Sequence, residues 1–432
     1  MAFDKAQSPA DSIRLRSALL VSTTGDWIYR FAVPTLILAV TGSALSTAFA
    51  YVLEYIPYIV VGMVSGVVAD RWDRRRIMVI CDGTSFVLAM VIAGVSLGHP
   101  PVAVLYLCAF ALACVRPFYF PAFQGLLVDT VAPEQRSRMN AWTQTVDSGL
   151  NLIGPVIGTA IVAAMGVSSA TLVNAVSFAM SALLVYQIRY GRASVDAAED
   201  AAAPQVIRDF LVGLRTLWQI KPIRYGTLLG TAANMAGYFV EGNLIYLGLH
   251  VEHLPKVALG LVFSGQGAGA LLGAAIAPRL VDRYSTGRLF TFGMGGSGVA
   301  MPVPVFLPYW WAVVVSWSLE AVATSIIVVS WFTIRQHVVP AAVTGRVAAV
   351  SRALAFAAIP LGAVLGGLFA STANPIRTVF GWAAALQLLV FIGTARSPVV
   401  QCDVRETPAE AEAVAATVRP AGPGVLDSAA DG

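Results

Sequence analysis

The stretch Gly66-Val67-Val68-Ala69-Asp70-Arg71-Trp72-Asp73-Arg74-Arg75-Arg76 decides the fold class. It crowds acidic residues and four arginines between two apolar segments, 46–68 and 77–97. A short loop this basic is typical of the cytoplasmic side of a multi-pass membrane protein. Such a loop can latch onto neighbouring helix ends in one conformation and release them in another. The alternative is that Arg75 and Arg76 only enforce the topology.

The composition excludes a large water-soluble protein. Of the 432 residues, 57% are hydrophobic and 12% are charged, whereas a soluble domain carries roughly 25% charged residues. The mean hydropathy is +0.73. The net charge of +4 is too mild and too scattered to indicate nucleic-acid binding. Cys81, Cys108 and Cys114 lie in apolar runs, so we expect no disulfide framework.

Apolar runs long enough to cross a bilayer recur along the chain. A hydrocarbon core about 30 Å thick needs about 20 helical residues. Runs of that length, separated by polar residues, Pro or Gly, predict twelve transmembrane helices and an all-α integral membrane protein. We expect these helices at 17–40, 46–68, 77–97, 102–128, 140–163, 168–188, 224–248, 257–278, 288–307, 309–332, 347–370 and 378–395.

Basic residues fall on one side of this layout. With both termini in the cytoplasm, the outer loops hold only Lys256 and Arg377 among the basic residues, which is the asymmetry that the positive-inside rule demands. We therefore expect a multi-pass protein of the inner (plasma) membrane. Its organisation would be a cytoplasmic N-terminus (1–16), a six-helix bundle (17–190), a cytoplasmic linker with an amphipathic helix (191–222), a second six-helix bundle (223–397) and a disordered cytoplasmic tail (398–432).

The two halves of the chain repeat one another. Asp70-Arg71, followed by Arg76, recurs as Asp282-Arg283 followed by Arg288, each time between the second and third helix of its half. Internal duplication with matching hydropathy is the mark of a transporter built from two related bundles. Its substrate site would lie between the bundles, near the bilayer midplane.

The run from Gly66 to Arg76 resembles the loop motif of the major facilitator superfamily, Gly-x-x-x-Asp-Arg-x-x-Arg-Arg. The resemblance implies two pseudo-symmetric six-helix bundles. It also implies that the acid of the motif meets the second bundle and that an arginine of the motif pairs with Asp129, at the end of the fourth helix. The conformational-switch residues are then expected to be Gly66, Asp70, Arg71, Arg74, Arg75, Arg76 and Asp129.

Small residues in the fifth expected helix form a second motif. Gly149, Gly154, Pro155 and Gly158 resemble the antiporter motif of the exporters in this superfamily, although Thr159 stands where a second Gly is usual. Small residues let helices pack closely, and Pro loosens one backbone hydrogen bond. A purely structural hinge is the alternative interpretation.

Shorter stretches indicate a branch of the superfamily. Phe120-Pro121-Ala122-Phe123, Asn140-Ala141 and Gly25-Asp26 resemble the branch that contains macrolide-efflux proteins and the enterobactin exporter. That resemblance implies export of drugs, macrolides, siderophores or related secondary metabolites. It also implies that the protein works as a monomer.

Several charged residues fall inside the expected helices. A charge at the bilayer centre costs about 2.5 to 3.5 kcal/mol on insertion scales, so retained charges usually face a cavity and serve a purpose. Acids in the fifth, seventh and tenth helices resemble the placement in a related bacterial multidrug antiporter. We expect the proton-coupling and substrate-cavity residues to be Asp26, Arg30, Arg116, Asp147, Glu241 and Glu320.

Two alternatives stay open for these charges. Asp26 can pair with Arg30, one turn away on the same helix, or with Arg116 of the fourth helix. Glu54 is expected to snorkel toward the outer leaflet, and Asp82 to cap its helix or pair with the loop arginines.

The predicted function is a proton-coupled exporter of amphipathic small molecules that works by alternating access. The chain has no Gly-x-x-x-x-Gly-Lys-Ser/Thr loop for ATP, so we expect a proton gradient as the energy source and no cofactor. Histidines lack metal-site spacing, so neither a metal site nor an enzyme is expected. The partners would be a small-molecule substrate, protons and the lipid bilayer, with no nucleic acid. The alternatives are an importer or symporter on the same fold, or a scaffold or receptor that has lost transport.

Overall fold

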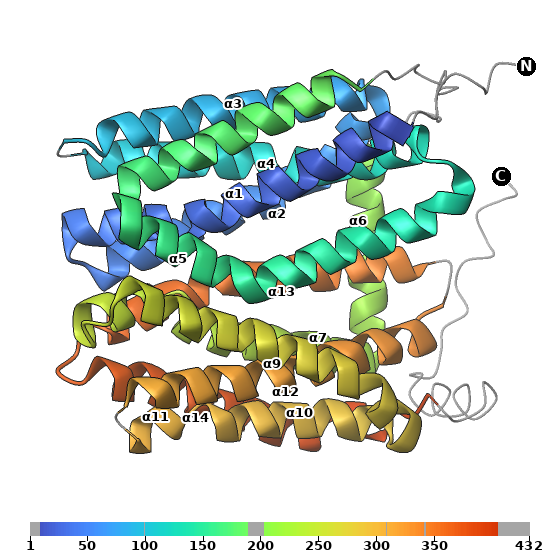
Figure 1. Cartoon of the computed structure of the whole chain (residues 1–432). Coiled ribbons are helices and arrows are strands. Elements are labelled where there is room, and N and C mark those ends of the chain that lie inside the picture. Colours follow the sequence, from blue (N-terminus) through green and yellow to red (C-terminus); the bar gives the residue numbers. More distant parts are fainter. Residues whose placement is uncertain (1–8, 99, 189–202, 308, 341–342, 405–432) are drawn as a thin grey trace, which may run out of the picture.

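The computed structural model of the chain describes residues 9–98, 100–188, 203–307, 309–340 and 343–404. Within these ranges the chain forms helices and no strand. Long helices lie side by side along one direction, those of the first half above those of the second half in Figure 1. Helix α6 (Ala203–Gln219) runs across them at the end where the described chain begins and finishes. We call this the α6 end and the opposite side the far end.

The described residues between 9 and 188 form five helices. They are α1 (Pro9–Thr41), α2 (Ala44–Arg71), α3 (Arg74–Val95), α4 (Val102–Thr130) and α5 (Pro133–Tyr186). Two of them begin at side-chain caps: Ser43 accepts a hydrogen bond from the amide of Ser46, and Asp73 accepts one from the amide of Arg76. Each cap satisfies an amide that has no partner inside the helix.

Helix α5 contains both of the spans expected at 140–163 and 168–188. A sharp turn at Gly166, with φ of 78°, separates its two arms at the far end. Glycine adopts this left-handed conformation without the steric penalty of a Cβ atom. The two spans are therefore joined by a kink rather than by a loop.

The second half contains long helices and short helical pieces. After α6 come α7 (Lys221–Glu241), α8 (Leu244–Tyr246), η1 (Leu247–Val251), α9 (Lys256–Arg283), α10 (Thr286–Ala300), α11 (Val303–Phe306), α12 (Trp310–Val338), α13 (Thr344–Phe369), α14 (Pro375–Ala395) and η3 (Pro398–Gln401). The expected spans 224–248 and 288–307 are thus each divided. The first breaks at Gly242 and the second at Met301-Pro302, where the Pro ring cannot continue the helical hydrogen bonds.

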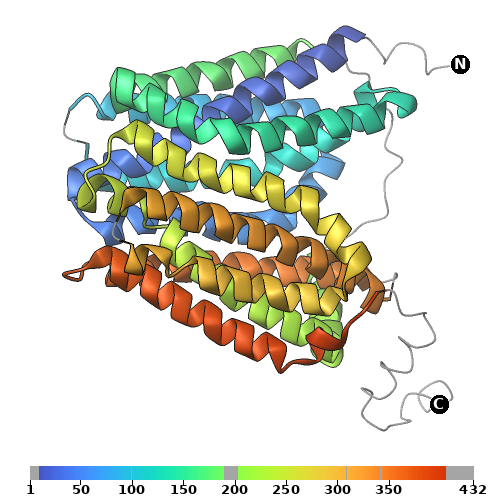
Figure 2. The same ribbon diagram turned by 60° about the horizontal axis from the view of Figure 1, so that its bottom comes forward.

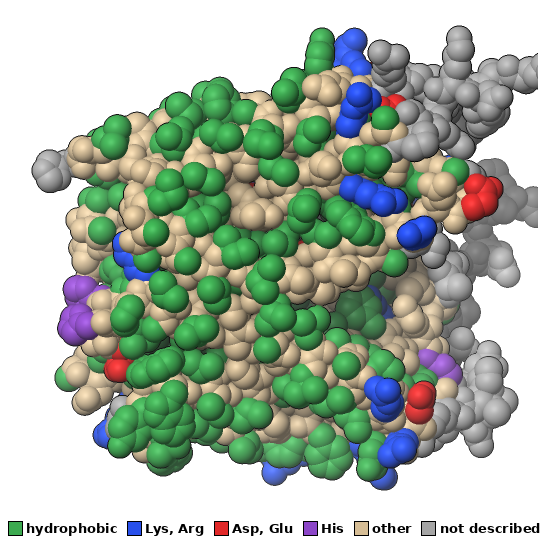
Figure 3. Space-filling model, viewed as in Figure 1, with side chains coloured by type: hydrophobic (Ala, Val, Ile, Leu, Met, Phe, Trp, Pro, Cys, Tyr) green, Lys and Arg blue, Asp and Glu red, His purple; other side chains and the backbone are tan. Residues whose placement is uncertain are grey.

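The surface between the two ends is apolar. Large hydrophobic side chains are exposed there, among them Leu107, Phe292, Val299 and Leu389. Figure 3 shows hydrophobic side chains over the middle of one face, whereas most charged side chains gather toward its two ends. Eight helical segments within the described residues are long and apolar enough to cross a bilayer. These features define a multi-pass membrane protein, while the expected total of twelve spans stays a prediction.

The two halves contact each other through α5 and α9, which lie side by side in Figures 1 and 2. Glycines on α9 make this close approach possible: a Cβ atom at Gly267 would lie 2.5 Å from the carbonyl oxygen of Asn151. Toward the far end, the ring of Phe31 packs edge-on against that of Phe263, with 5.0 Å between centroids. The Tyr55 and Tyr238 hydroxyls lie 3.2 Å apart.

Two expected boundaries need correction. Helix α1 begins at Pro9 rather than at 17, and Leu15 is fully buried. The tail expected to be disordered from 398 begins instead with the helical turn η3, because Val399 packs against Phe290. The amide of Gly287 also donates a 2.7 Å hydrogen bond to the carbonyl of Cys402.

The expected linker helix is present as α6. Leu217 of this helix is buried against Val347 and Val350 of α13. Residues 191–202 of the expected linker lie outside the described residues. So do 189–190, the tail beyond 404 and residues 1–8 at the N-terminus.

Candidate functional site

A cavity of about 590 Å³ lies among α1, α3, α4 and α5. Its lining extends toward the α6 end through Leu19 of α1 and Gln124 of α4. The wall combines aromatic rings with charged groups, which suits a cavity that binds an amphipathic molecule. The charged residues of the lining are Asp26, Arg30, Asp82, Arg116 and Asp147.

Asp26 pairs across the helices with Arg116. The Nη2 atom of Arg116 donates to Oδ2 of Asp26 at 2.8 Å. The side chain of Arg116 is 30% exposed and that of Asp26 is 19% exposed. The guanidinium of Arg30 instead lies over the indole ring of Trp27, 4.7 Å from its centroid. Of the two alternatives for Asp26, the structure therefore favours pairing with Arg116. Both charges remain in contact with the cavity.

A second cavity of about 80 Å³ lies between the halves of the molecule. Glu54, Glu241 and Arg30 contribute its charged groups, and Gln266 donates a 3.4 Å hydrogen bond to Glu241 Oε2. Glu54 therefore faces this cavity rather than the outer leaflet, which corrects the expectation that it snorkels. Trp27 and Arg30 line both cavities, so they form the partition between them.

The remaining expected coupling acids lie in different surroundings. Asp147 is exposed to the large cavity from α5. Glu320 lines neither cavity: it is buried between α10 and α12, where Thr324 and Ser297 donate hydrogen bonds of 2.6 Å and 3.4 Å to its Oε1 atom. The structure thus brings Asp26, Arg30, Arg116 and Asp147 together and leaves Glu320 apart.

The glycines of the antiporter motif lie in two different surroundings. A Cβ atom at Gly154 would lie 2.5 Å from the ring of Trp27, and one at Gly158 would lie 2.7 Å from the carbonyl oxygen of Trp27. Both glycines, with the neighbouring Pro155, are buried. Gly149, by contrast, has open space beside it. The close approach of α1 to α5 therefore depends on Gly154 and Gly158.

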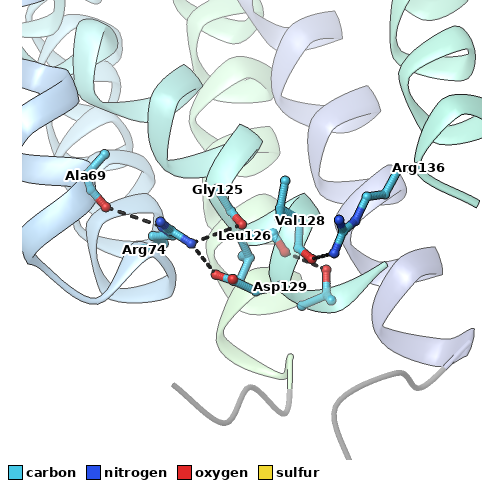
Figure 4. A network of polar contacts seen from close by, with 8 residues as sticks. Ala69, Arg74, Gly125, Leu126, Val128, Asp129 and Arg136 are labelled. Atoms are coloured by element: carbon cyan, nitrogen blue, oxygen red, sulfur yellow. Dashed lines mark hydrogen bonds and ion pairs between the residues drawn. The ribbon is translucent and has the colours of Figure 1, made fainter. Parts of the chain in front are cut away.

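The switch loop joins α2 and α3 to the end of α4. Arg74 donates a 2.6 Å hydrogen bond to Oδ2 of Asp129 and longer bonds of 3.4 Å to the carbonyl oxygens of Ala69 and Gly125 (Figure 4). Arg136 donates to the carbonyl of Val128 at 2.7 Å in the same network. The expected partnership of Asp129 with an arginine of the loop is therefore present.

Other members of the switch set differ in their contacts. Arg75 donates a 2.9 Å hydrogen bond to the carbonyl of Ile188 and lies over the Tyr186 ring. Arg76 is largely exposed and sits 3.8 Å from Asp73. The surroundings of three further members are outside the described part of the structure: Gly66, Asp70 and Arg71.

Sequence patterns missed the environment of Asp82. Instead of capping α3 or pairing with a loop arginine, Asp82 accepts a 2.6 Å hydrogen bond from Ser181 of α5 and lines the large cavity. No local sequence pattern signals this environment, because Ser181 lies 99 residues along the chain from Asp82. Within the described residues, no cluster of His, Cys, Asp and Glu is arranged to hold a metal ion.

Charged residues around a cavity between membrane-spanning helices are typical of membrane transporters. The family model of the Major Facilitator Superfamily matches residues 17–256. The chain belongs to this superfamily, whose members are transporters rather than enzymes.

Curated relatives include efflux pumps. The chain is 28% identical over 393 residues to the multidrug efflux pump Tap of Mycolicibacterium fortuitum, covering 86% of this chain and 92% of the relative. It is 21% identical over 336 residues to the macrolide efflux protein A of Streptococcus pyogenes, covering 76% of this chain and 82% of the relative.

Solved structures show the same fold in two conformations. A bacterial homologue of the iron transporter ferroportin in its inward-facing state matches with a TM-score of 0.69 and 18% identity, over 90% of this chain and 99% of the other. The outward-facing state matches with a TM-score of 0.57 and 19% identity, over 89% and 98%. The arrangement of helices is therefore closer to the inward-facing one.

Proposed function

We propose that this protein is a proton-coupled exporter of amphipathic small molecules in the plasma membrane, driven by the proton gradient without a cofactor and active as a monomer. The observation that carries the proposal is the Asp26–Arg116 pair in the wall of the large cavity. The similarity to the efflux pump Tap over most of both chains supports the outward direction of transport.

The ion pair suggests how proton binding can be coupled to substrate release. When a proton from the cavity water binds the carboxylate of Asp26, the acid becomes neutral and its attraction to Arg116 falls. The helices α1 and α4 are then free to separate, and substrate release can follow. When the proton leaves, the pair forms again. The antiporter glycines would serve this motion by letting α1 move closely along α5.

Transport into proteoliposomes tests the proposal. The vesicles carry the full chain with its α6 end outside and an acidic lumen, and the probes are lipophilic dyes and macrolides. An antiporter accumulates the probe while protons leave the lumen. A symporter would instead move preloaded probe out together with protons. That result, or no gradient dependence in folded protein, would contradict the proposal.

Asp26→Asn should reduce gradient-driven uptake by about tenfold or more. The reason is that one charge-assisted hydrogen bond contributes about 1.5 to 3 kcal/mol, and about 1.4 kcal/mol corresponds to tenfold. Asp209→Asn is the matched control, because Asp209 lies on the surface of α6, outside both cavities. Equal uptake by the two variants would show that Asp26 takes no part in the coupling step.

A further inference from the structure

A buried carboxyl in the large cavity lies among hydroxyl groups. Asp82 is 2% exposed, and the Ser181 hydroxyl donates to its Oδ2 atom at 2.6 Å. Ser22 of α1 lines the same cavity. The Tyr119 hydroxyl lies 3.4 Å from the Ser181 hydroxyl, and either can be the donor. Three helices, α3, α4 and α5, thus contribute to one hydrogen-bonded chain.

The partners of Asp82 differ in kind from those of Asp26. Asp26 has the guanidinium of Arg116, whereas none of the ion pairs between described residues includes Asp82. A buried carboxylate without a cation is expensive in a membrane protein. The titratable and charged groups that share its cavity are Asp26 and Arg30 on α1, Cys81 on α3, Arg116 and Tyr119 on α4, and Asp147 on α5.

Hydroxyl groups can serve a carboxyl in both of its protonation states. A Ser or Tyr hydroxyl donates to an ionised carboxylate and, after rotation of its O–H bond, accepts from a protonated one. An arginine guanidinium or a backbone N–H group can only donate. The surroundings of Asp82 therefore remain hydrogen-bonded whether a proton is present or absent, which is the property that a proton-binding site requires.

We propose that Asp82 is a second proton-binding site of the large cavity, supported by the hydroxyl groups of Ser181 and Tyr119. One proton from cavity water binds the carboxylate to give the neutral acid and returns to water when it leaves, with no other bond changed. Asp82 lines the same cavity as Asp26 and Arg116, so the site adjoins the proposed coupling pair. The inference rests on the proposed proton coupling and adds a second carboxyl to it.

Infrared spectroscopy of the purified full chain tests the proposal without substrate or gradient. The protein carries ¹³C-labelled aspartate carboxyl groups, and spectra are compared across a pH range. We expect a pH-dependent aspartic acid band that Asp82→Asn removes and Asp26→Asn retains. If Asp82→Asn leaves every pH-dependent aspartic acid band in place, the proposal is overturned.

A second pair of variants covers the case in which Asp82→Asn does not fold. Ser181→Ala keeps the carboxyl and removes one hydrogen-bond partner, so the same band should change frequency. Ser177→Ala is the matched control, because Ser177 is also buried on α5 but bonds within its own helix, to the carbonyl of Asn174. An identical band in both serine variants would also overturn the proposal. A failure of gradient-driven export alone would contradict the proposed function and leave this band unchanged.

Discussion

At the scale of single residues, Trp27 organises the centre of the first half. Its indole ring lies against Gly154 on one side and carries the Arg30 guanidinium at 4.7 Å. Any side chain at Gly154 would occupy the space of the ring. The Trp27 ring can therefore lie between the two cavities only because residue 154 of α5 has no side chain.

Gly154→Ala should destabilise the protein and impair transport. A Cβ atom there would lie 2.5 Å from the Trp27 ring, and overpacking of this kind costs about 1 to 3 kcal/mol. Gly149→Ala, on the same helix, has open space and should behave like the wild type. Thermal unfolding in detergent and dye transport compare the two variants. Equal melting temperatures and equal transport would show that α1 and α5 tolerate a side chain at their crossing.

Sequence patterns predicted which charged residues line the cavity better than they predicted which of these residues pair with each other. The cost of burying charge singled out Asp26 and Arg116, but spacing along α1 equally allowed an Asp26–Arg30 pair. The choice depends on how α1 and α4 cross, which no local pattern encodes. Glu320 was grouped with the cavity acids for the same reason, although α12 turns it toward Ser297.

At the scale of elements, α6 is attached to the second half by both packing and charge. Asp209 and Arg346 form a 3.0 Å ion pair in which both side chains are 42% exposed. A Cβ atom at Gly213 would lie 2.5 Å from the carbonyl oxygen of Arg346, and Leu217 is fully buried. Close contact at Gly213 and burial of Leu217 should therefore hold α6 more firmly than the ion pair.

Gly213→Leu should release α6 from α13, whereas Asp209→Asn should leave it in place. A leucine cannot fit beside the α13 backbone, while an exposed ion pair contributes only about 0.2 to 1 kcal/mol. Hydrogen–deuterium exchange of the α6 amides measures the difference. Faster exchange in Asp209→Asn than in Gly213→Leu would show that the ion pair holds α6 more firmly than the close packing at Gly213 does.

Hydropathy predicted the positions of the helices and missed where they are interrupted. Apolar runs near 224–248 and 288–307 look continuous, yet the structure breaks them at Gly242 and at Met301-Pro302. At the first break the side-chain Nδ2 of Asn243 donates to the carbonyl of Ala363, a tertiary contact on another helix. The amphipathic pattern of α6 was visible in the sequence, because it needs only the helical repeat of one segment.

At the scale of the whole molecule, the two halves are closed together at the far end. Leu45 of α2 lies against Gly367 of α13, where a Cβ atom would be 3.2 Å from the Leu45 Cα. The large cavity extends toward the opposite, α6 end. Alternating access requires these far-end contacts to open once in every transport cycle.

A disulfide across the far end should therefore stop transport. The variant Leu45→Cys/Gly367→Cys, with the four native cysteines replaced, should lose dye transport on oxidation and regain it on reduction. The control Gly298→Cys/Leu388→Cys joins α10 to α14 within the second half, where a Cβ atom at 298 would lie 3.5 Å from the Leu388 amide nitrogen. Transport should survive that crosslink. Full transport by completely crosslinked Leu45→Cys/Gly367→Cys would argue against rocking of the halves.

The partition formed by Trp27 and Arg30 also bears on the electrical insulation of the membrane. A continuous column of water through a transporter would let protons run down their gradient and dissipate the energy store of the cell. The two cavities approach each other at one indole ring and one guanidinium, which line both. In this conformation these two side chains therefore separate the cavities, and the cation of Arg30 would repel a proton that moved from one cavity toward the other.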